Sequence, residues 1–249
     1  MRGYTRRGFG VAAGAGLLSG CATVAAPNAA LSPPTPGGVG PLRLAPVHVA
    51  ESRVTRVVVG LRPFRPAGFV VRGESLGDKR LVHNYGHGGG GVTLSWGTAH
   101  LAVEQGFAGP DRDYAVLGCG AVGLATARLL QRRGGRVTLY ARDLPPDTTS
   151  NIAGGQWWPA SVYDSDAVGP EFRGQLSRAA ALAYREYQSL IGPTYGVRWI
   201  RNYRLSERPI HEGEVTRTLR DMAPDMRDLA PGEHPFGAAH VQQYDTMLV

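Results

Sequence analysis

Cysteine is scarce in this 249-residue chain, which contains Cys21 and Cys119 and no other cysteine. One lies near the N-terminus and one inside a glycine-rich loop, so the sequence predicts no disulfide framework, even in an oxidising compartment. Internal repeats are lacking as well. The apolar stretch from Gly8 to Leu18 is too short and too rich in Gly and Ala to span a bilayer as a stable helix. Apolar residues nevertheless make up 43% of the chain, enough for a real hydrophobic core.

A strong excess of charge is also lacking. The net charge is +7, and removal of residues 1–20, with three arginines and no acid, lowers it from +7 to +4. The chain has no basic stripe interleaved with aromatic side chains, so we expect no nucleic-acid partner. A modest positive charge weakly favours anionic substrates.

The N-terminal segment predicts export. Thr5-Arg6-Arg7-Gly8-Phe9 resembles a twin-arginine signal, and Leu18-Ser19-Gly20-Cys21 resembles a lipobox. We therefore expect a signal over 1–21 and an exported protein, periplasmic or anchored to the membrane only through a lipid on Cys21. An ordinary basic leader with a chance cysteine is the alternative. Residues 22–46 are rich in Pro, Gly and Ala and predict a tether.

The remainder predicts strands and helices in three parts, 47–109, 110–165 and 166–249. Residues 86–91 and the tail before Val249 show no clear element. The hydrophobic pattern predicts strands over 53–61, 69–71, 80–83, 114–117, 136–140 and 195–205. It predicts helices over 92–105, 121–133 and 170–191, and a short interrupted helix over 217–228.

A glycine loop joins the strand at 114–117 to the helix at 121–133. In Gly118-x-Gly120-x-x-Gly123 the first glycine turns the chain, the second admits a pyrophosphate to the backbone, and the third lets helix and strand pack closely. The positive end of the helix then faces the phosphates. The loop predicts a dinucleotide site; a glycine-rich turn between packed elements is the alternative.

The residues after the second strand of this unit bear on the choice of dinucleotide. Asp143 could hold ribose hydroxyls, whereas Arg142 could accept the 2′-phosphate of NADP, so the loop alone does not select FAD. The hydroxyl run Thr148-Thr149-Ser150 can bond phosphate oxygens. Residues 153–159 then place bare backbone beside large aromatic rings.

At this point the chain resembles the D-amino-acid oxidase family of FAD enzymes. Residues 115–159 resemble the family's N-terminal FAD-binding stretch, and residues 60–97 resemble its C-terminal stretch. The resemblance implies FAD and an α/β fold: a Rossmann-like FAD-binding domain with a partial mixed-sheet (α+β) substrate domain. The implied cofactor-binding residues are Gly88, Gly91, Val92, Thr93, Gly118, Gly120, Ala121, Val122, Gly123, Arg142, Asp143, Thr148, Thr149, Ser150, Gly155, Gln156 and Trp157.

The same resemblance implies a substrate site. Arg62 would bind the substrate carboxylate, which suits a planar guanidinium; a surface ion pair is the alternative. The carbonyl of Gly89 would receive the substrate amino group, and Thr93 would bond the flavin pyrimidine edge. No side chain is assigned as a catalytic base. The family usually has a large residue where Gly90 stands, so the edge of the pocket is expected to differ.

Three histidines in this region, His83, His87 and His100, could suggest zinc. No acid or cysteine completes a ligand set, so we expect no metal site. We expect His83 and His87 to bond backbone within the loop instead.

The two resembling stretches occur in the reverse of the family's order. We interpret this as a circular permutation, which costs little when chain ends lie close together; a chimeric gene model is the alternative. The family's middle region would follow Val249. We therefore expect a truncated chain that does not form a complete active site alone.

The function implied is an FAD-dependent oxidase acting on a D-amino acid, with oxygen as the second substrate. Hydride would leave the α-carbon, giving an imino acid, then a 2-oxo acid and ammonia, with hydrogen peroxide from oxygen. Two alternatives remain: a related glycine or amine oxidase, or a lipid-tethered remnant that binds a dinucleotide without catalysis.

Overall fold

A computed structural model describes residues 44–45, 47–107 and 109–249. The expected export signal, the lipidation site at Cys21 and nearly all of the expected tether lie outside these residues. The described residues belong to one contact unit. None of the helices within this part of the chain has the length and apolar character that crossing a bilayer requires.

A β-hairpin leads into the first long helix. β1 (Val70–Leu76) and β2 (Lys79–Tyr85) pair antiparallel, as their β-branched residues predict. A 3₁₀ turn, η2 (Gly88–Gly90), then runs directly into α1 (Gly91–Gly106). The expectation that residues 86–91 hold no regular structure was wrong, because Gly88–Gly90 form this 3₁₀ turn and Gly91 already has α-helical dihedrals.

A β-α-β unit follows, as predicted. β3 (Asp113–Leu117) and β4 (Arg136–Tyr140) are parallel neighbours, and α2 (Ala121–Arg132) connects them. Two further 3₁₀ turns, η3 (Thr149–Ile152) and η4 (Ser165–Ala167), lie in the long connection to the next helix. This unit is the Rossmann-like part of the α/β fold.

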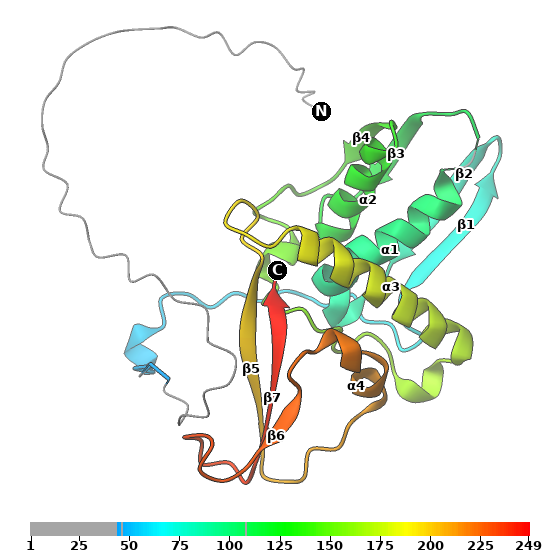
Figure 1. The fold of residues 1–249 in the computed structure, drawn as a ribbon. Coiled ribbons are helices and arrows are strands. Elements are labelled where there is room, and N and C mark those ends of the chain that lie inside the picture. Colours follow the sequence, from blue (N-terminus) through cyan, green and yellow to red (C-terminus); the bar gives the residue numbers. More distant parts are fainter. Residues whose placement is uncertain (1–43, 46, 108) are drawn as a thin grey trace, which may run out of the picture. The chain divides into compact units, whose positions relative to one another are not determined.

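Helix α1 packs against both α2 and α3 (Pro170–Ser189), and the three helices lie side by side in Figure 1. Helix α3 buries Leu176, Ala180, Ala183 and Tyr187, and Tyr184 is half-buried. Helices α1 and α3 approach closely at Gly97 of α1, where an added Cβ would lie 1.8 Å from the carbonyl oxygen of Ala179 in α3.

The C-terminal part forms a three-stranded sheet in the order β5-β7-β6, with β5 (Arg198–Ser206), β6 (Arg227–Leu229) and β7 (His240–Leu248). Both pairings are antiparallel, so the expected mixed sheet was wrong for the described residues. The expectation of a tail without a closing element was also wrong, because β7 is the central strand. Its buried Gln242, Gln243 and Thr246 interrupt the apolar alternation by which strands are found.

The expected interrupted helix over 217–228 is displaced in the structure. It begins earlier, as α4 (Glu214–Thr218) followed by the 3₁₀ turn η5 (Arg220–Met222). Residues 227 and 228 already belong to β6.

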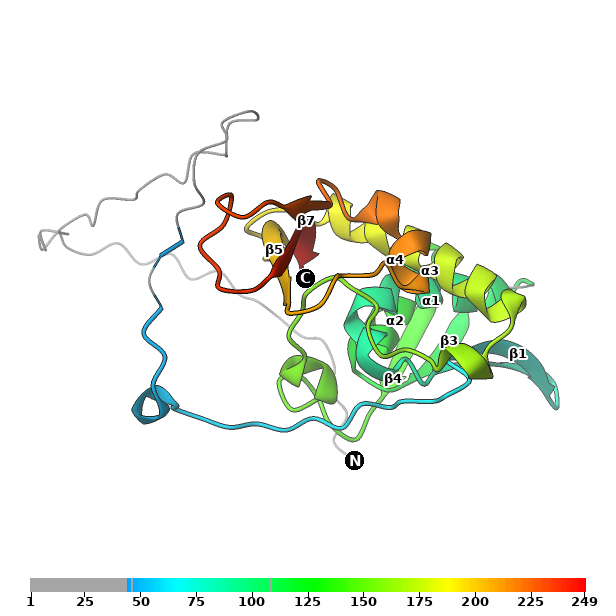
Figure 2. The same ribbon diagram turned by 90° about the horizontal axis from the view of Figure 1, so that it is seen from below.

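The strand expected over 53–61 does not form. A 3₁₀ turn, η1 (Glu51–Arg53), precedes an extended segment, and Figure 2 shows this segment running beyond the blue helical turn toward β1. Val57 and Val59 are exposed. β-Branched residues favour extended backbone, but within the described residues no strand pairs with this segment.

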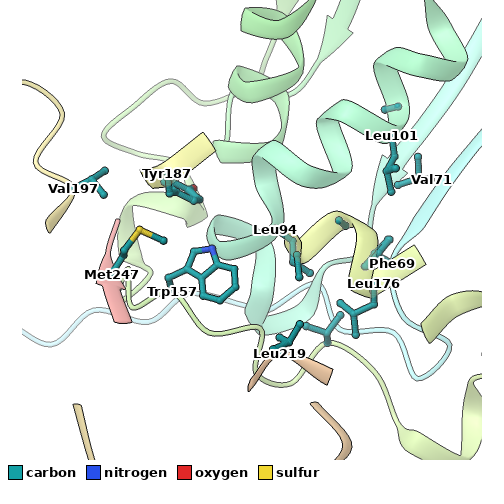
Figure 3. Packing of buried hydrophobic residues seen from close by; sticks show 14 residues of the cluster. Phe69, Val71, Leu94, Leu101, Trp157, Leu176, Tyr187, Val197, Leu219 and Met247 are labelled. Carbon is teal, nitrogen blue, oxygen red and sulfur yellow. The ribbon is translucent and has the colours of Figure 1, made fainter. Parts of the chain in front are cut away.

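The main hydrophobic core joins the helices to the C-terminal sheet. Trp157 is fully buried, and Figure 3 shows its indole with Met247 and Leu94 on either side. A second cluster lies between α1, α2 and β3, where Val103, Val116 and Leu129 are buried together. The core therefore holds α1 in place on several sides.

Alanine substitutions at two helix glycines are expected to change the stability in opposite directions. Gly97→Ala would force α1 away from the backbone of α3, and we expect it to lower the free energy of unfolding by about 2–4 kcal/mol. Gly174→Ala, on the exposed side of α3 where an added Cβ meets no described atom within 4 Å, is expected to raise it by about 0.5–1 kcal/mol. Urea unfolding of both variants tests this pair, and equal effects would contradict the helix contact.

Candidate functional site

The glycine loop between β3 and α2 has the geometry of a nucleotide turn. Gly118 has φ +115°, a conformation that favours glycine, and its N–H donates to the carbonyl of Tyr140 at 2.8 Å. An added Cβ at Gly123 would lie 2.1 Å from the carbonyl oxygen of Gly118. Each glycine therefore permits the helix to begin directly against the end of the strand.

The N-terminus of α2 meets the hydroxyl run. Helix α2 begins after Gly120, and among the described residues no side chain caps it at that position. The Ala121 N–H donates to Ser150 Oγ at 3.0 Å. Thr148 instead is buried and donates to Asn151 Oδ1 at 2.8 Å, whereas Thr149 is exposed. Of the three hydroxyls, that of Ser150 is the one in contact with the helix end.

Arg142 and Asp143, after the second strand of this unit, form an ion pair with each other at 2.7 Å. The Arg142 side chain is 92% exposed. The hydrogen bond from Arg142 holds the pKa of the Asp143 carboxyl below its usual value. Contact of Asp143 with a ribose would therefore compete with this exposed pair, which surface screening keeps weak.

The second glycine turn presses against residues 160–161. The Gly88 N–H donates to the carbonyl of Pro63 at 3.2 Å, and the Gly89 N–H donates to that of Ser161 at 2.9 Å. Gly88 has φ +56°, and its Cβ would lie 2.2 Å from the Ser161 oxygen. A Cβ at Gly89 would lie 2.5 Å from the oxygen of Ala160. A residue larger than glycine does not fit at either position without moving this backbone.

A cavity of ≈ 410 Å³ opens beside this turn. The first turn of α1 borders it with uncharged residues, so the partial positive charge of the helix N-terminus reaches the cavity. Thr93 donates from Oγ1 to the carbonyl of Trp158 at 3.3 Å. The cavity is lined by Gly89, Val92, Thr93, Ala153, Gly154, Gly155, Gln156, Trp158, Ala160, Asn202, Tyr203, Arg204 and Tyr244.

Arg62, in the extended segment, lies beside Gly89, which lines this cavity. Its Nη1 lies 3.4 Å from the position of a Cβ on Gly89 and donates to Ser161 Oγ at 3.4 Å. Ser161 is neutral, so this hydrogen bond leaves the guanidinium charge available to a ligand. The same segment passes Ile152 at Gly60, where an added Cβ would lie 3.4 Å away. The two distant stretches of sequence therefore meet at one cavity.

The segment 155–158 alternates between core and cavity. Gly155 has φ +71°, and Gln156 donates from Nε2 to Tyr244 Oη at 3.3 Å. Trp157 was expected among the cofactor-binding residues. Its side chain is fully buried in the core, and its backbone N–H donates to the backbone carbonyl of Met247. The neighbouring ring of Trp158 lines the cavity instead, because successive residues of an extended segment point to opposite sides.

The histidines contact side chains, which corrects the expectation of bonds to loop backbone. His87 is buried, and its Nε2 lies 2.9 Å from Thr98 Oγ1. His83 places Nε2 3.1 Å from Glu74 Oε1, a close contact without the alignment of a hydrogen bond. His100 Nε2 lies 3.0 Å from Glu186 Oε1. Within the described residues, no three metal-binding side chains gather at one point.

The wall of the cavity formed by the C-terminal sheet was missed by sequence reasoning. Asn202, Arg204 and Tyr244 come from β5 and β7. Alternation along residues 198–206 places Asn202 and Arg204 on one face of a strand. That signal did not indicate which face meets the glycine turn, because the partner strand β7 was not recognised.

The family-model comparison matches the chain to "FAD dependent oxidoreductase" (DAO) over residues 42–105 and 113–244. The chain belongs to this family of FAD-dependent oxidoreductases. The gap between the two matched ranges falls on the connection between α1 and β3. Circular permutation stays a prediction.

Curated relatives match over short stretches. The D-amino-acid oxidase of Streptomyces coelicolor is 54% identical over 57 residues, 23% of this chain and 18% of the relative. That of Rubrobacter xylanophilus is 53% identical over 61 residues, 24% and 17%. The human D-aspartate oxidase is 52% identical over 53 residues, 20% and 15%. The matched part of the chain thus spans less than a fifth of the length of these relatives.

The described residues fit FAD, the cofactor of the family. Gly118 and Gly154 leave bare backbone, since an added Cβ at either would meet no described atom within 4 Å. The N-termini of α2 and α1 supply positive ends for a pyrophosphate and for a flavin ring. Ser150 and Ala153 lie close in sequence between the two sites, Ser150 at the glycine loop and Ala153 in the cavity. One extended dinucleotide is therefore compatible with both.

The burial of His87 predicts a pH dependence of stability. Burial lowers the pKa of His87 from 6.5 to about 4, so in this interval the unfolded chain binds more protons than the folded one. The stabilisation from burying neutral His87 is fully present above pH 6.5. As the pH falls from 6.5 toward the folded-state pKa of about 4, the free energy of unfolding decreases by up to about 3 kcal/mol.

Urea unfolding at about pH 7.5 and about pH 5 measures this loss. We expect His87→Gln to flatten the dependence, and the same change at the exposed His48 to leave it intact. Equal slopes in all three proteins would contradict the assignment to His87.

Proposed function

We propose that the chain provides the flavin and carboxylate-binding parts of an oxidase acting on D-amino acids. The reaction gives an imino acid, which hydrolyses to a 2-oxo acid and ammonia, and oxygen is reduced to hydrogen peroxide. The observation that carries the proposal is the position of Arg62 beside Gly89 at the edge of the 410 Å³ cavity. The D-amino-acid oxidases of Streptomyces coelicolor and Rubrobacter xylanophilus, named above, support the choice of reaction.

Arg62 supplies the charge that orients the substrate. A guanidinium binds a carboxylate through two parallel hydrogen bonds, which fixes both position and rotation. Its neighbour Ser161 contributes a neutral hydroxyl to this wall, so the arginine charge is not neutralised there.

Gly89 supplies the second contact. Its N–H is bonded to Ser161, which fixes the turn, and its carbonyl oxygen, with two lone pairs, can accept from the substrate ammonium group. With carboxylate and ammonium group both held, the α-carbon of one enantiomer has a defined orientation in the cavity.

FAD supplies the hydride acceptor when bound. The chain supplies position and field: the N-terminus of α1 places partial positive charge at the cavity, where it favours negative charge. No side chain of the chain is required to remove the proton of the α-carbon as a base, because hydrogen and electron pair leave together.

The test uses the complete gene product, purified and saturated with FAD. Flavin absorbance should be retained after gel filtration and should bleach anaerobically with a D-amino acid but not with its L-enantiomer. Bleaching only with glycine or a secondary amine would instead establish a glycine or amine oxidase. Protein that takes up no flavin would establish a non-catalytic remnant.

Arg62→Ala is predicted to weaken substrate binding. Loss of a charged bidentate contact costs roughly 3 kcal/mol, so KM or the half-bleaching concentration should rise about a hundredfold. Arg72→Ala is the matched control, because its side chain is 68% exposed and pairs with Glu74 on the hairpin. Equal KM values or half-bleaching concentrations for the two variants would contradict the placement of Arg62 in the substrate site.

The expected export is a separate part of the proposal. It rests on Arg6-Arg7 and on Cys21 in the sequence. Cell fractionation of the unaltered chain and of Cys21→Ser tests the anchor: the lipidated form should sediment with membranes, and the variant should not. Equal distribution of the two would exclude lipid attachment at Cys21.

A further inference from the structure

A second cavity adjoins the proposed substrate site. It measures ≈ 310 Å³ and shares Trp158, Arg204 and Tyr244 with the 410 Å³ cavity. His211 and Thr216 border it on the side away from the glycine turn. A molecule held at Gly89 therefore has space for a side chain to extend past Trp158 into a second compartment.

The shared wall is one face of the C-terminal sheet. Arg204 lies opposite Gln242 in the β5–β7 pairing, and Asn202 lies opposite Tyr244. Directly opposed residues of an antiparallel pair project from the same face. The guanidinium of Arg204 and the phenol of Tyr244 thus stand together between the two cavities.

Arg204 carries a charge for which the surroundings provide no partner. Among the described residues it forms no ion pair and no side-chain hydrogen bond. Its charge is nevertheless felt at the cavity: burial raises the pKa of Tyr244, and Arg204 opposes that rise.

Three acids of the surrounding elements have partners other than Arg204. Glu214 pairs with Arg173, and Glu212 pairs with Arg220. Asp228 accepts a hydrogen bond from the Gln242 amide at 3.1 Å. A cation on a cavity wall whose neighbouring carboxylates are satisfied elsewhere is suited to an incoming anion.

We propose that Arg204 binds a carboxylate on the substrate's side chain, so that the site prefers acidic D-amino acids. The inference rests on the proposed function and assigns the two ends of the substrate: Arg62 and Gly89 hold the amino-acid end, and Arg204 holds the distal carboxylate. Both Gly89 and Arg204 line the same cavity. His211 adds a second potential donor in the adjoining compartment.

The first test compares acids with their neutral amides on the FAD-saturated protein. D-Aspartate and D-glutamate should be oxidised with a kcat/KM at least about tenfold above that of D-asparagine and D-glutamine. Arg204→Gln should remove most of this ratio through KM. Arg185→Gln, on the exposed side of α3, should leave the ratio unchanged. Acids no better than amides in the unaltered protein would overturn the inference and leave the proposed function standing.

The second test needs neither turnover nor a variant. Succinate has two carboxylates, and succinamate has one carboxylate and one amide of nearly the same shape. Calorimetric titration of the unaltered protein should show succinate binding about tenfold more tightly, with the preference falling as salt rises. Equal affinities would overturn the role of Arg204. If no D-amino acid bleaches the flavin but succinate is preferred, the proposed reaction fails and the anion site stands.

Discussion

The close approach of α1 and α3 is the contact on which the site depends. Gly97 lets the helix backbones touch at Ala179. One and a half turns toward the N-terminus, the Tyr187 hydroxyl of α3 donates to the carbonyl of Val92 at 2.8 Å. Burial raises the pKa of Tyr187 to about 12, so the phenol stays protonated and the donor is retained. These two contacts fix the end of α1 that faces the cavity.

Everything before α1 is positioned through that helix end. The glycine turn continues directly into α1 and is pressed on Ala160 and Ser161 from the other half of the chain. His87, just before the turn, is bonded to Thr98 inside α1. The turn is thus held from both sides, and the preorganisation of the candidate site arises from backbone contacts rather than from long side chains.

Local pattern predicted the Rossmann-like unit and the helices well, because their signals lie within short windows. The glycine spacing of 118–123 and the apolar face of α3 are examples. Of the C-terminal sheet, β5 was predicted, but β7 was missed, since it buries glutamines whose hydrogen bonds depend on side chains elsewhere in the fold. The strand predicted over 53–61 was wrong because its valines favour extended backbone, whereas strand pairing requires a partner that local sequence does not reveal.

The residues of the candidate site likewise divide into those that the sequence predicted and those that it did not. Residues that act through backbone, such as Gly88, Gly89 and Gly123, were predictable because only glycine allows those approaches. Trp157 and Trp158 could not be told apart without the direction of the segment that carries them. Arg204 was not found for a different reason: it is an exposed charged residue on a strand, and its sequence does not distinguish it from other solvent-facing charges.

The adjacent pair Trp157 and Trp158 has an optical consequence. One indole is sealed in hydrocarbon and the other borders a space where a yellow chromophore would lie. The first should emit at short wavelength and shift to longer wavelength when the core melts. Energy transfer to the chromophore acts over a longer range than the spacing of neighbouring residues, so both indoles should be quenched when the cleft is occupied. The wavelength of emission would thereby report integrity of the interior, and its intensity would report occupancy of the cleft.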